Sequence, residues 1–362
     1  MDAVTIMGIG KGTRSRAARC LRARGFGVLV VTLAAAMLGA AWTGAAPAQD
    51  APANPPAARA QQERSVDSLS VVKLRSKSVA NARSARTLGS QREGTGVVID
   101  ASGLVMTIGY LITEAETVEL STSDGKVFPA TVVGYDSVTG LGLVKALTPL
   151  PVKPVEMGQS SEAAERDMVL VVGFDGVAPA YIVSKRPFVG YWEYLLDEAI
   201  YTAPATVNWQ GAALLNREGR LLGIGSLVVG DAIGSRGQIP GNMFVPIDVI
   251  KPVLGDFVAN GRSTTRPRPW IGVSSQEVQG NLIVTRVSPE GPADDAGLKA
   301  GDIIVGIGGQ PIKGQADFYT RLWKSGEAGI EIAIEVLKRN RVETYKIKSI
   351  DRNRYFRSRP TL

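Results

Sequence analysis

Short apolar runs, separated by glycine, aspartate and proline, fill the chain from Gly94 to about Val258, and no other feature constrains the fold more. The runs are rich in β-branched residues and include GVVID, LVMTI, TVEL, ATVVGYD, LGLVKAL, MVLVVGF, EAIYTA and LLGIGSLVV. Turn-forming sequences such as DASG and SDGK lie between them. Because short strands separated by such turns are typical of all-β barrels and sandwiches, the pattern predicts one of these architectures. The segment VPIDVIKPVLGDFVANG, Val245 to Gly261, predicts a short helix that closes the domain.

A second compact unit follows at residues 270–350, after the basic, proline-containing sequence RSTTRPRP at 262–269. This composition is typical of an interdomain linker. The second unit combines strand-like runs such as NLIVTRV and IEIAIEVLKR with one helix-like stretch, QADFYTRLWKSG, which predicts an α+β domain. The last residues, 351–362, form a basic tail that we expect to be frayed.

The N-terminus has the three parts of a secretory signal peptide. Basic residues are followed by the uncharged apolar run from Phe26 to Trp42 and then by small residues that end at Ala48. We therefore expect residues 1–48 to be a signal peptide, followed by a disordered Ala/Pro linker at 49–66. The alternative is an uncleaved membrane anchor, because the apolar run is close to the shortest spanning helix. Either interpretation exports the rest of the chain.

The charge and the cysteine content of the chain depend on this N-terminal segment. The formal net charge is +7, and residues 1–48 contribute six basic residues and one acidic residue, so about +2 remains after cleavage. The basic character therefore reflects targeting and does not indicate nucleic-acid binding. The single cysteine, Cys20, also lies in the segment, and the chain contains no histidine. We expect no disulfide, no metal site and no cofactor in the exported protein.

Several of these runs, in this order, resemble the HtrA/Deg family of exported trypsin-like serine proteases with a C-terminal PDZ domain. The stretches that carry the resemblance are GTGVVIDASGLVMT, SDGKVFPATVVGYDSVTGLGLVKA, NWQGAALLNREGRLLGIGS and MFVPIDVIKPVL. The resemblance covers the chain from about Gly94 to Ile350. It implies a trypsin-like double β-barrel at 67–261 and a PDZ domain at 270–350, a mainly β fold overall.

The resemblance also implies that all three catalytic triad residues are absent. The family's histidine run reads TIGYLI here, which places Tyr110 at the histidine position. The aspartate run reads DSVTGLG, so Gly140 stands at the catalytic position and Asp136 matches an earlier, noncatalytic acid. The nucleophile run reads NWQGA at 208–212, with Gln210 in place of the serine. A chain with these residues is a degenerate member of the family, a pseudoprotease.

The chemistry of these residues leads to the same expectation without the alignment. A Ser/His/Asp mechanism needs a base that accepts the hydroxyl proton near neutral pH, and no histidine is present. The amide of Gln210 is not a nucleophile, and Tyr110, with an ordinary pKa near 10, is a poor base at neutral pH. Asn208, Trp209 and Ala212 also disfavour an oxyanion site, and we expect Trp209 to fill the cleft.

A Ser/Lys dyad is the one catalytic alternative that needs neither histidine nor cysteine. Ser226 or Ser235 could serve with Lys145 or Lys185, although no spacing in the sequence brings such a pair together. Solvated surface positions are the simpler interpretation of these side chains.

The PDZ-like unit retains the residues that the resemblance assigns to peptide binding. Trp270, Ile271, Gly272 and Val273 match the loop whose backbone amides hold a terminal carboxylate, and Gly272 allows the amides to converge. On the following helix the predicted groove residues are Phe318 and Leu322, together with Tyr319, with core packing as the alternative for each. Arg266 and Arg268 could attract a carboxylate or could be solvated linker charges.

The function implied is that of an exported pseudoprotease that binds peptide C-termini or partner proteins through its PDZ domain. Envelope protein quality control and regulation of active HtrA proteases are the expected settings. The partners implied are a homo-trimer or a hetero-oligomer with active HtrA proteases, and no nucleic acid. The expected location is the periplasm, or the inner membrane facing it. The alternatives are an active serine-type endopeptidase with a non-standard nucleophile and a structural oligomeric scaffold.

Overall fold

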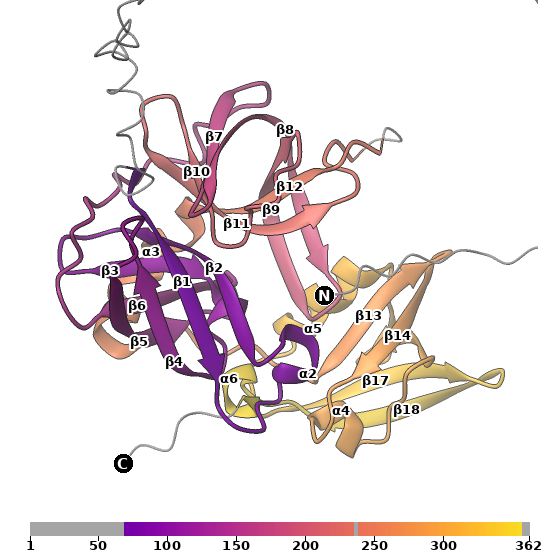
Figure 1. Cartoon of the computed structure of the whole chain (residues 1–362). Coiled ribbons are helices and arrows are strands. Elements are labelled where there is room, and N and C mark those ends of the chain that lie inside the picture. Colours follow the sequence, from indigo (N-terminus) through magenta and orange to yellow (C-terminus); the bar gives the residue numbers. More distant parts are fainter. Residues whose placement is uncertain (1–68, 235–237, 357–362) are drawn as a thin grey trace, which may run out of the picture. The chain divides into compact units, whose positions relative to one another are not determined.

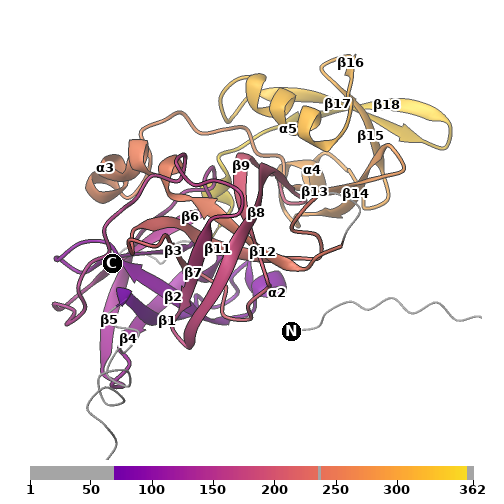
Figure 2. The ribbon, with the colours of Figure 1, turned by 90° about the horizontal axis from the view of Figure 1, so that it is seen from above.

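The computed structural model describes residues 69–234 and 238–356, which lie within one compact unit. These residues form two closed β-barrels and a separate sheet with flanking helices (Figures 1 and 2). The predicted mainly β fold, a trypsin-like double barrel followed by a PDZ domain, is confirmed. The expected signal peptide at 1–48 and linker at 49–66 lie outside the described residues. In the described part of the chain, no helix reaches the length and apolar character needed to span a membrane.

The first barrel is a closed antiparallel sheet of six strands in the order β1-β2-β3-β6-β5-β4. Apolar side chains from every strand fill its interior, as the alternating pattern requires. Two short helices, α2 (Ala85–Leu88) and η2 (Gly109–Leu111), lie in its connections. The strands are β1 (Val71–Ser78), β2 (Gln91–Val98), β3 (Leu104–Ile108), β4 (Ala115–Ser121), β5 (Val127–Tyr135) and β6 (Leu141–Ala146).

The second barrel has the order β10-β11-β12-β9-β8-β7. Its longest strands, β8 and β9, form a hairpin that projects from the barrel toward the C-terminal sheet (Figure 1). The expected closing helix is α3 (Lys251–Asn260), preceded by η3 (Ile247–Val249). The strands are β7 (Met168–Gly173), β8 (Gly176–Gly190), β9 (Tyr194–Ala203), β10 (Ala213–Leu215), β11 (Leu221–Val229) and β12 (Gly241–Pro246).

The C-terminal domain is a sheet in the order β13-β14-β15-β17-β18, with β16 paired to β15. It has its own core, in which helix α5 (Gln315–Lys324) contributes three fully buried side chains. The remaining elements are β13 (Val273–Val278), β14 (Asn281–Val287), α4 (Pro292–Asp295), β15 (Ile303–Ile307), β16 (Gln310–Pro311), β17 (Glu331–Lys338) and β18 (Arg341–Lys348).

The first part of the basic tail is ordered, contrary to the expectation that the tail is frayed. Residues Arg352–Tyr355 form helix α6, whose N-cap is the side chain of Asp351, which accepts from the Asn353 amide at 2.9 Å. The ring of Tyr355 is buried against Trp270, with ring centroids 4.7 Å apart. Apolar burial of this one ring therefore anchors a segment whose overall composition is polar and basic.

Candidate functional site

Tyr110 lies in η2, directly after strand β3, and its hydroxyl donates to the carbonyl of Ser226 on β11, 3.0 Å away. The hydrogen bond joins the first barrel to the second. Burial raises the pKa of Tyr110 well above its usual value near 10. The phenol therefore keeps its proton at neutral pH and cannot accept one from a nucleophile.

Gly140 ends the loop between β5 and β6, and its conformation suits glycine. Its φ is +77°, and a Cβ added there would lie 3.0 Å from the Tyr194 hydroxyl oxygen. That hydroxyl donates to the Thr139 carbonyl at 2.6 Å. The buried carboxylate of Asp136 accepts from the amides of Val138 and Thr139, each at 3.1 Å. Asp136 thus closes the turn, and Tyr194 occupies the space beside Gly140.

Gln210 lies in the loop before β10, where its backbone carbonyl accepts from the Thr95 amide at 2.8 Å. Thr95 belongs to β2, so this hydrogen bond also crosses from one barrel to the other. Trp209, which we expect to fill the cleft, is half-buried, and its carbonyl accepts from the Ala212 amide at 3.2 Å. The loop is held by its backbone in both barrels.

Three loops bring the predicted triad positions to the junction of the barrels. The carbonyl of Gly140 accepts from the Gly109 amide, next to Tyr110, at 2.8 Å. A Cβ added at Gly94 would lie 2.6 Å from a Leu111 methyl carbon and 2.8 Å from the Gln210 carbonyl oxygen. The neighbours of Tyr110 therefore contact the Gly140 loop on one side and approach the Gln210 loop on the other. Tyr110 keeps its phenol proton, Gly140 has no side chain and Gln210 carries an amide, so these positions provide neither an ionised base nor a serine-like nucleophile.

The lysines of the predicted Ser/Lys alternative have other partners. Lys145 donates to the hydroxyl of Ser102, and Lys185 donates to the Ala163 carbonyl at 3.0 Å and pairs with Glu198 at 3.0 Å. The side chain of Ser226 is buried, and its carbonyl accepts from Tyr110. Ser235 lies outside the described residues.

The loop at 271–273 binds a carboxylate, and the carboxylate is that of Glu193. The amides of Ile271, Gly272 and Val273 donate to the two oxygens of Glu193 at 3.2, 2.7 and 2.8 Å. Gly272 has φ +85°, which turns the chain so that the amides converge. Burial raises the pKa of Glu193 to about 7, against the opposing effect of the three amides and Arg352.

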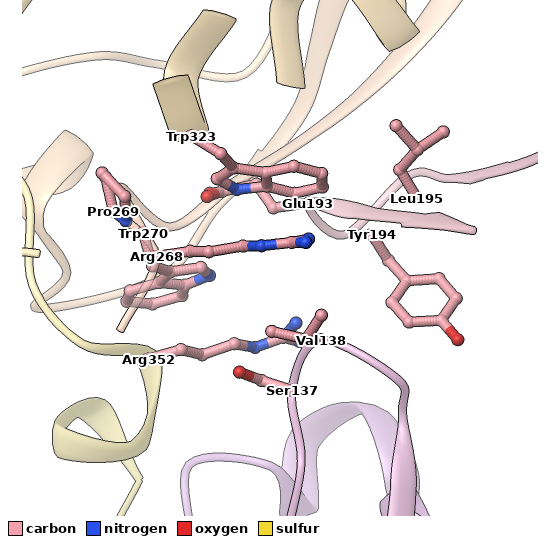
Figure 3. Close-up of a pocket in the computed structure, with 10 residues that line it drawn as sticks. All are labelled: Ser137, Val138, Glu193, Tyr194, Leu195, Arg268, Pro269, Trp270, Trp323 and Arg352. Carbon is pink, nitrogen blue, oxygen red and sulfur yellow. The ribbon is translucent and has the colours of Figure 1, made fainter. Parts of the chain in front are cut away.

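Glu193 is the last residue of the three-residue turn between β8 and β9, at positions 191–193. Its φ of +55° is a left-handed conformation that a non-glycine residue adopts at a cost in free energy. Only 4% of Glu193 is exposed. Figure 3 shows it at the start of β9, near Trp323, in a small cavity that is also lined by Arg268 and Arg352.

Helix α5 places one of its three predicted groove residues, Tyr319, against the β8–β9 turn. Phe318 and Leu322 are fully buried in the core of the C-terminal domain, which is their core-packing alternative, and Tyr319 is buried in the same core. Gln315, one turn before Tyr319, was not predicted and donates to the Gly190 carbonyl, next to the turn, at 3.4 Å. The Tyr319 hydroxyl accepts from the Glu193 amide at 3.2 Å, and the Gln315 side-chain amide donates to the Ser275 carbonyl at 2.7 Å.

The remaining predicted residues of this loop have structural contacts. The Trp270 backbone pairs with Ile350 through two hydrogen bonds of 3.0 Å. Arg266 pairs with Glu327 on the surface. The Arg268 guanidinium lies 4.7 Å from the Trp323 ring centroid, between the two tryptophan rings in Figure 3. Neither arginine contacts the carboxylate of Glu193 through a hydrogen bond.

Comparison with known proteins agrees with this architecture. The family described as the trypsin-like peptidase domain matches residues 94–224, and the family described as the PDZ domain matches residues 269–348. The putative serine protease HhoA of Synechocystis sp. is 30% identical over 251 residues, which are 61% of this chain and 61% of that protein. The periplasmic pH-dependent serine endoprotease DegQ of Escherichia coli is 28% identical over 261 residues, which are 68% of this chain and 56% of that protein.

In its domains and in their order, the chain is similar to HtrA-type proteases. It spans between about half and three-fifths of the length of the curated HtrA relatives it matches. An HtrA-type protease of known structure, an AlgW variant with tripeptide, is 21% identical, with a TM-score of 0.50 over 79% of this chain and 94% of that one. That likeness supports the shared HtrA fold.

Sequence reasoning placed the 271–273 loop but missed Glu193. An isolated acidic residue after two aromatic residues, in GYWE, carries no sequence signal for a partner about eighty positions away.

Proposed function

We propose that this chain is an exported HtrA-like pseudoprotease that acts by binding peptide C-termini or partner proteins through its PDZ domain. The observation that carries the proposal is the identity of the predicted triad positions, Tyr110, Gly140 and Gln210, in a chain without histidine. The side chains at these three positions supply no group that could take a proton from a nucleophile at neutral pH and return it to the leaving amine. The curated relatives are named serine proteases. In this proposal the chain keeps their fold but lacks the residues that would cleave a peptide bond.

The amide loop at 271–273 supports the binding part of the proposal. Three converging N–H groups are suited to an α-carboxylate, and strand β13 begins at Val273, where an extended peptide would add as a further strand. Envelope protein quality control, or regulation of active HtrA proteases, is the proposed setting, because several relatives are named as periplasmic.

A degradation assay tests the loss of catalysis. Protein purified after export from a bacterial host is incubated with fluorescein-labelled casein, with an active HtrA protease assayed in parallel. We expect no release of fragments from the wild type or from Gln210→Ser, because serine without a base is not activated. Turnover by the wild type that a single substitution abolishes would establish the alternative, an active endopeptidase with a non-standard nucleophile. Turnover by Gln210→Ser alone would also overturn the proposal.

The proposed assembly is a homo-trimer or a hetero-oligomer with an active HtrA protease. Light scattering on the purified chain, alone and mixed with such a protease, measures it directly. A monomer under both conditions would remove the assembly from the proposal and would exclude the alternative of a structural oligomeric scaffold.

A further inference from the structure

The turn at 191–193 lies along β13 in the position of a ligand strand. The Ser275 amide donates to the Tyr191 carbonyl at 2.8 Å, and two residues further on Glu193 places its carboxylate on the amides of the 271–273 loop. Helix α5 covers the other side, where the Tyr319 hydroxyl accepts from the Glu193 amide. A PDZ groove recognises a backbone that hydrogen-bonds to its edge strand and a carboxylate on its amide loop. The turn is not extended, but it supplies one such backbone hydrogen bond and the carboxylate.

We propose that the β8–β9 turn is an internal ligand of the PDZ groove, so that an external chain with a free α-carboxylate binds only by displacing Glu193. This inference rests on the proposed peptide-binding function and assigns its regulation. The three amide protons are all directed at Glu193, and they cannot serve a second carboxylate while it is bound. Release of the turn and binding of a peptide are then one competitive equilibrium.

The local geometry fits a segment that can leave the groove. Glu193 is held in a left-handed conformation, and departure from the loop relieves that strain. The displaced carboxylate would regain water, whereas the loop amides would be satisfied by the incoming carboxylate. Intramolecular attachment keeps the local concentration of Glu193 high, so removal of its carboxylate strengthens the binding of external ligands.

The turn also connects the groove to the predicted triad region. Tyr194 follows Glu193 directly, and its hydroxyl donates to the Thr139 carbonyl beside Gly140. Displacement of Glu193 therefore moves a residue whose neighbour contacts the 136–140 loop. A ligand that displaces Glu193 from the groove would therefore change the contact of Tyr194 with the 136–140 loop of the first barrel.

Fluorescence anisotropy of the full exported chain tests the proposal with a labelled pool of random decapeptides that carry a free C-terminal carboxylate. The same pool with amidated C-termini is the ligand control. We expect Glu193→Ala to bind the free-carboxylate pool at least tenfold more tightly than the wild type, with no gain for the amidated pool. Glu198→Gln, which removes a charge from an exposed position on the same hairpin, should bind as the wild type does.

Hydrogen exchange at the amides of residues 271–273 supplies a readout that needs no peptide. We expect faster exchange in Glu193→Ala than in the wild type or Glu198→Gln, while exchange in the core strand β15 stays unchanged and shows that the domain is folded. Equal affinity of all variants for the free-carboxylate pool would overturn the internal ligand and leave the proposed function standing. Faster exchange without any peptide binding would instead overturn the peptide-binding function, and with it the competition.

Discussion

Glu193 shows that a single side chain can combine two opposing electrostatic effects. Three backbone amides favour its ionised form, yet burial outweighs them and raises its pKa from 4.5 to about 7. The other groups near it are Arg352 of α6, which lowers the pKa, Arg268 in the same cavity, and the uncharged hydroxyl of Tyr319 on α5. The bound turn therefore holds a proton more tightly than the released turn does.

The pH dependence of peptide binding follows from this shift. Because the bound Glu193 has the raised pKa, its docking is strongest below pH 4.5 and weakens as the pH rises through about 7. Between these two pH values the docking free energy of Glu193 weakens by about 3 kcal/mol. A peptide α-carboxylate stays ionised above pH 5, so its own charge does not change over the range. We expect the Kd of the free-carboxylate pool to fall at least tenfold between pH 5 and pH 8 in anisotropy titrations.

Glu193→Gln is the control for this prediction, because its amide does not titrate. Its Kd should be constant over the same pH range. A wild-type Kd that is independent of pH, or that rises with pH, would show that Glu193 does not control access to the groove.

The residues of the amide loop could be predicted from the sequence, because a local motif fixes the backbone at Ile271, Gly272 and Val273. The roles of Phe318 and Leu322 could not be decided, because a helix pattern shows which residues are apolar but not which of two apolar surroundings they enter. The role of Glu193 could not be predicted, because its contact with the 271–273 loop depends on how the β8–β9 hairpin of the second barrel packs on the C-terminal domain.

At the scale of elements, strands with apolar runs were predicted and strand β1 was not. Its sequence, VVKLRSKS, alternates correctly, but serines at positions 76 and 78 take buried places that apolar residues usually fill. Barrel closure between β2 and β4 orders this segment despite its polar sequence. The C-terminal end of helix α3 was predicted, because Gly261 follows its last residue. Its start was not, because the predicted segment began at Val245, which belongs to β12, and η3 lies in between.

The loop between β5 and β6 is adapted to glycine at position 140, and restoration of a side chain there should destabilise the protein. A left-handed φ costs a non-glycine residue about 1–2 kcal/mol. Gly140→Ala also places a Cβ 3.0 Å from the Tyr194 hydroxyl and disturbs its hydrogen bond to Thr139, which costs about 1 kcal/mol more. Urea denaturation of the wild type and of Gly140→Ala measures this loss as a difference in the free energy of unfolding.

Gly125→Ala is the matched control, because Gly125 has φ +82° and an added Cβ would meet no atom within 4 Å. We expect Gly140→Ala to lower the free energy of unfolding by more than Gly125→Ala does. Equal losses would mean that Tyr194 yields freely and does not constrain the predicted aspartate position.

At the scale of the whole molecule, one aromatic residue near the C-terminus connects the first barrel to the PDZ domain. The Tyr355 ring packs on Trp270, and its hydroxyl donates to the Pro289 carbonyl at 2.9 Å. From the first barrel, the Arg83 guanidinium lies 4.4 Å from the centre of the same ring and also pairs with Glu290 at 2.5 Å. The sequence predicted the two domains, but their connection depends on contacts that no local pattern encodes.

Tyr355→Ala should therefore destabilise the protein and uncouple its domains. Removal of a buried aromatic ring costs about 3 kcal/mol or more, and here the loss falls on contacts that link two separate cores. In calorimetry we expect the wild type to unfold in one main transition and Tyr355→Ala to unfold in two, with the PDZ domain melting first. Arg354→Ala, at the exposed neighbouring position, should keep the wild-type profile. A single transition of unchanged midpoint in Tyr355→Ala would contradict this role of the ring and would mean that the other contacts between the domains, such as the β8–β9 turn and the Arg83–Glu290 pair, hold them together.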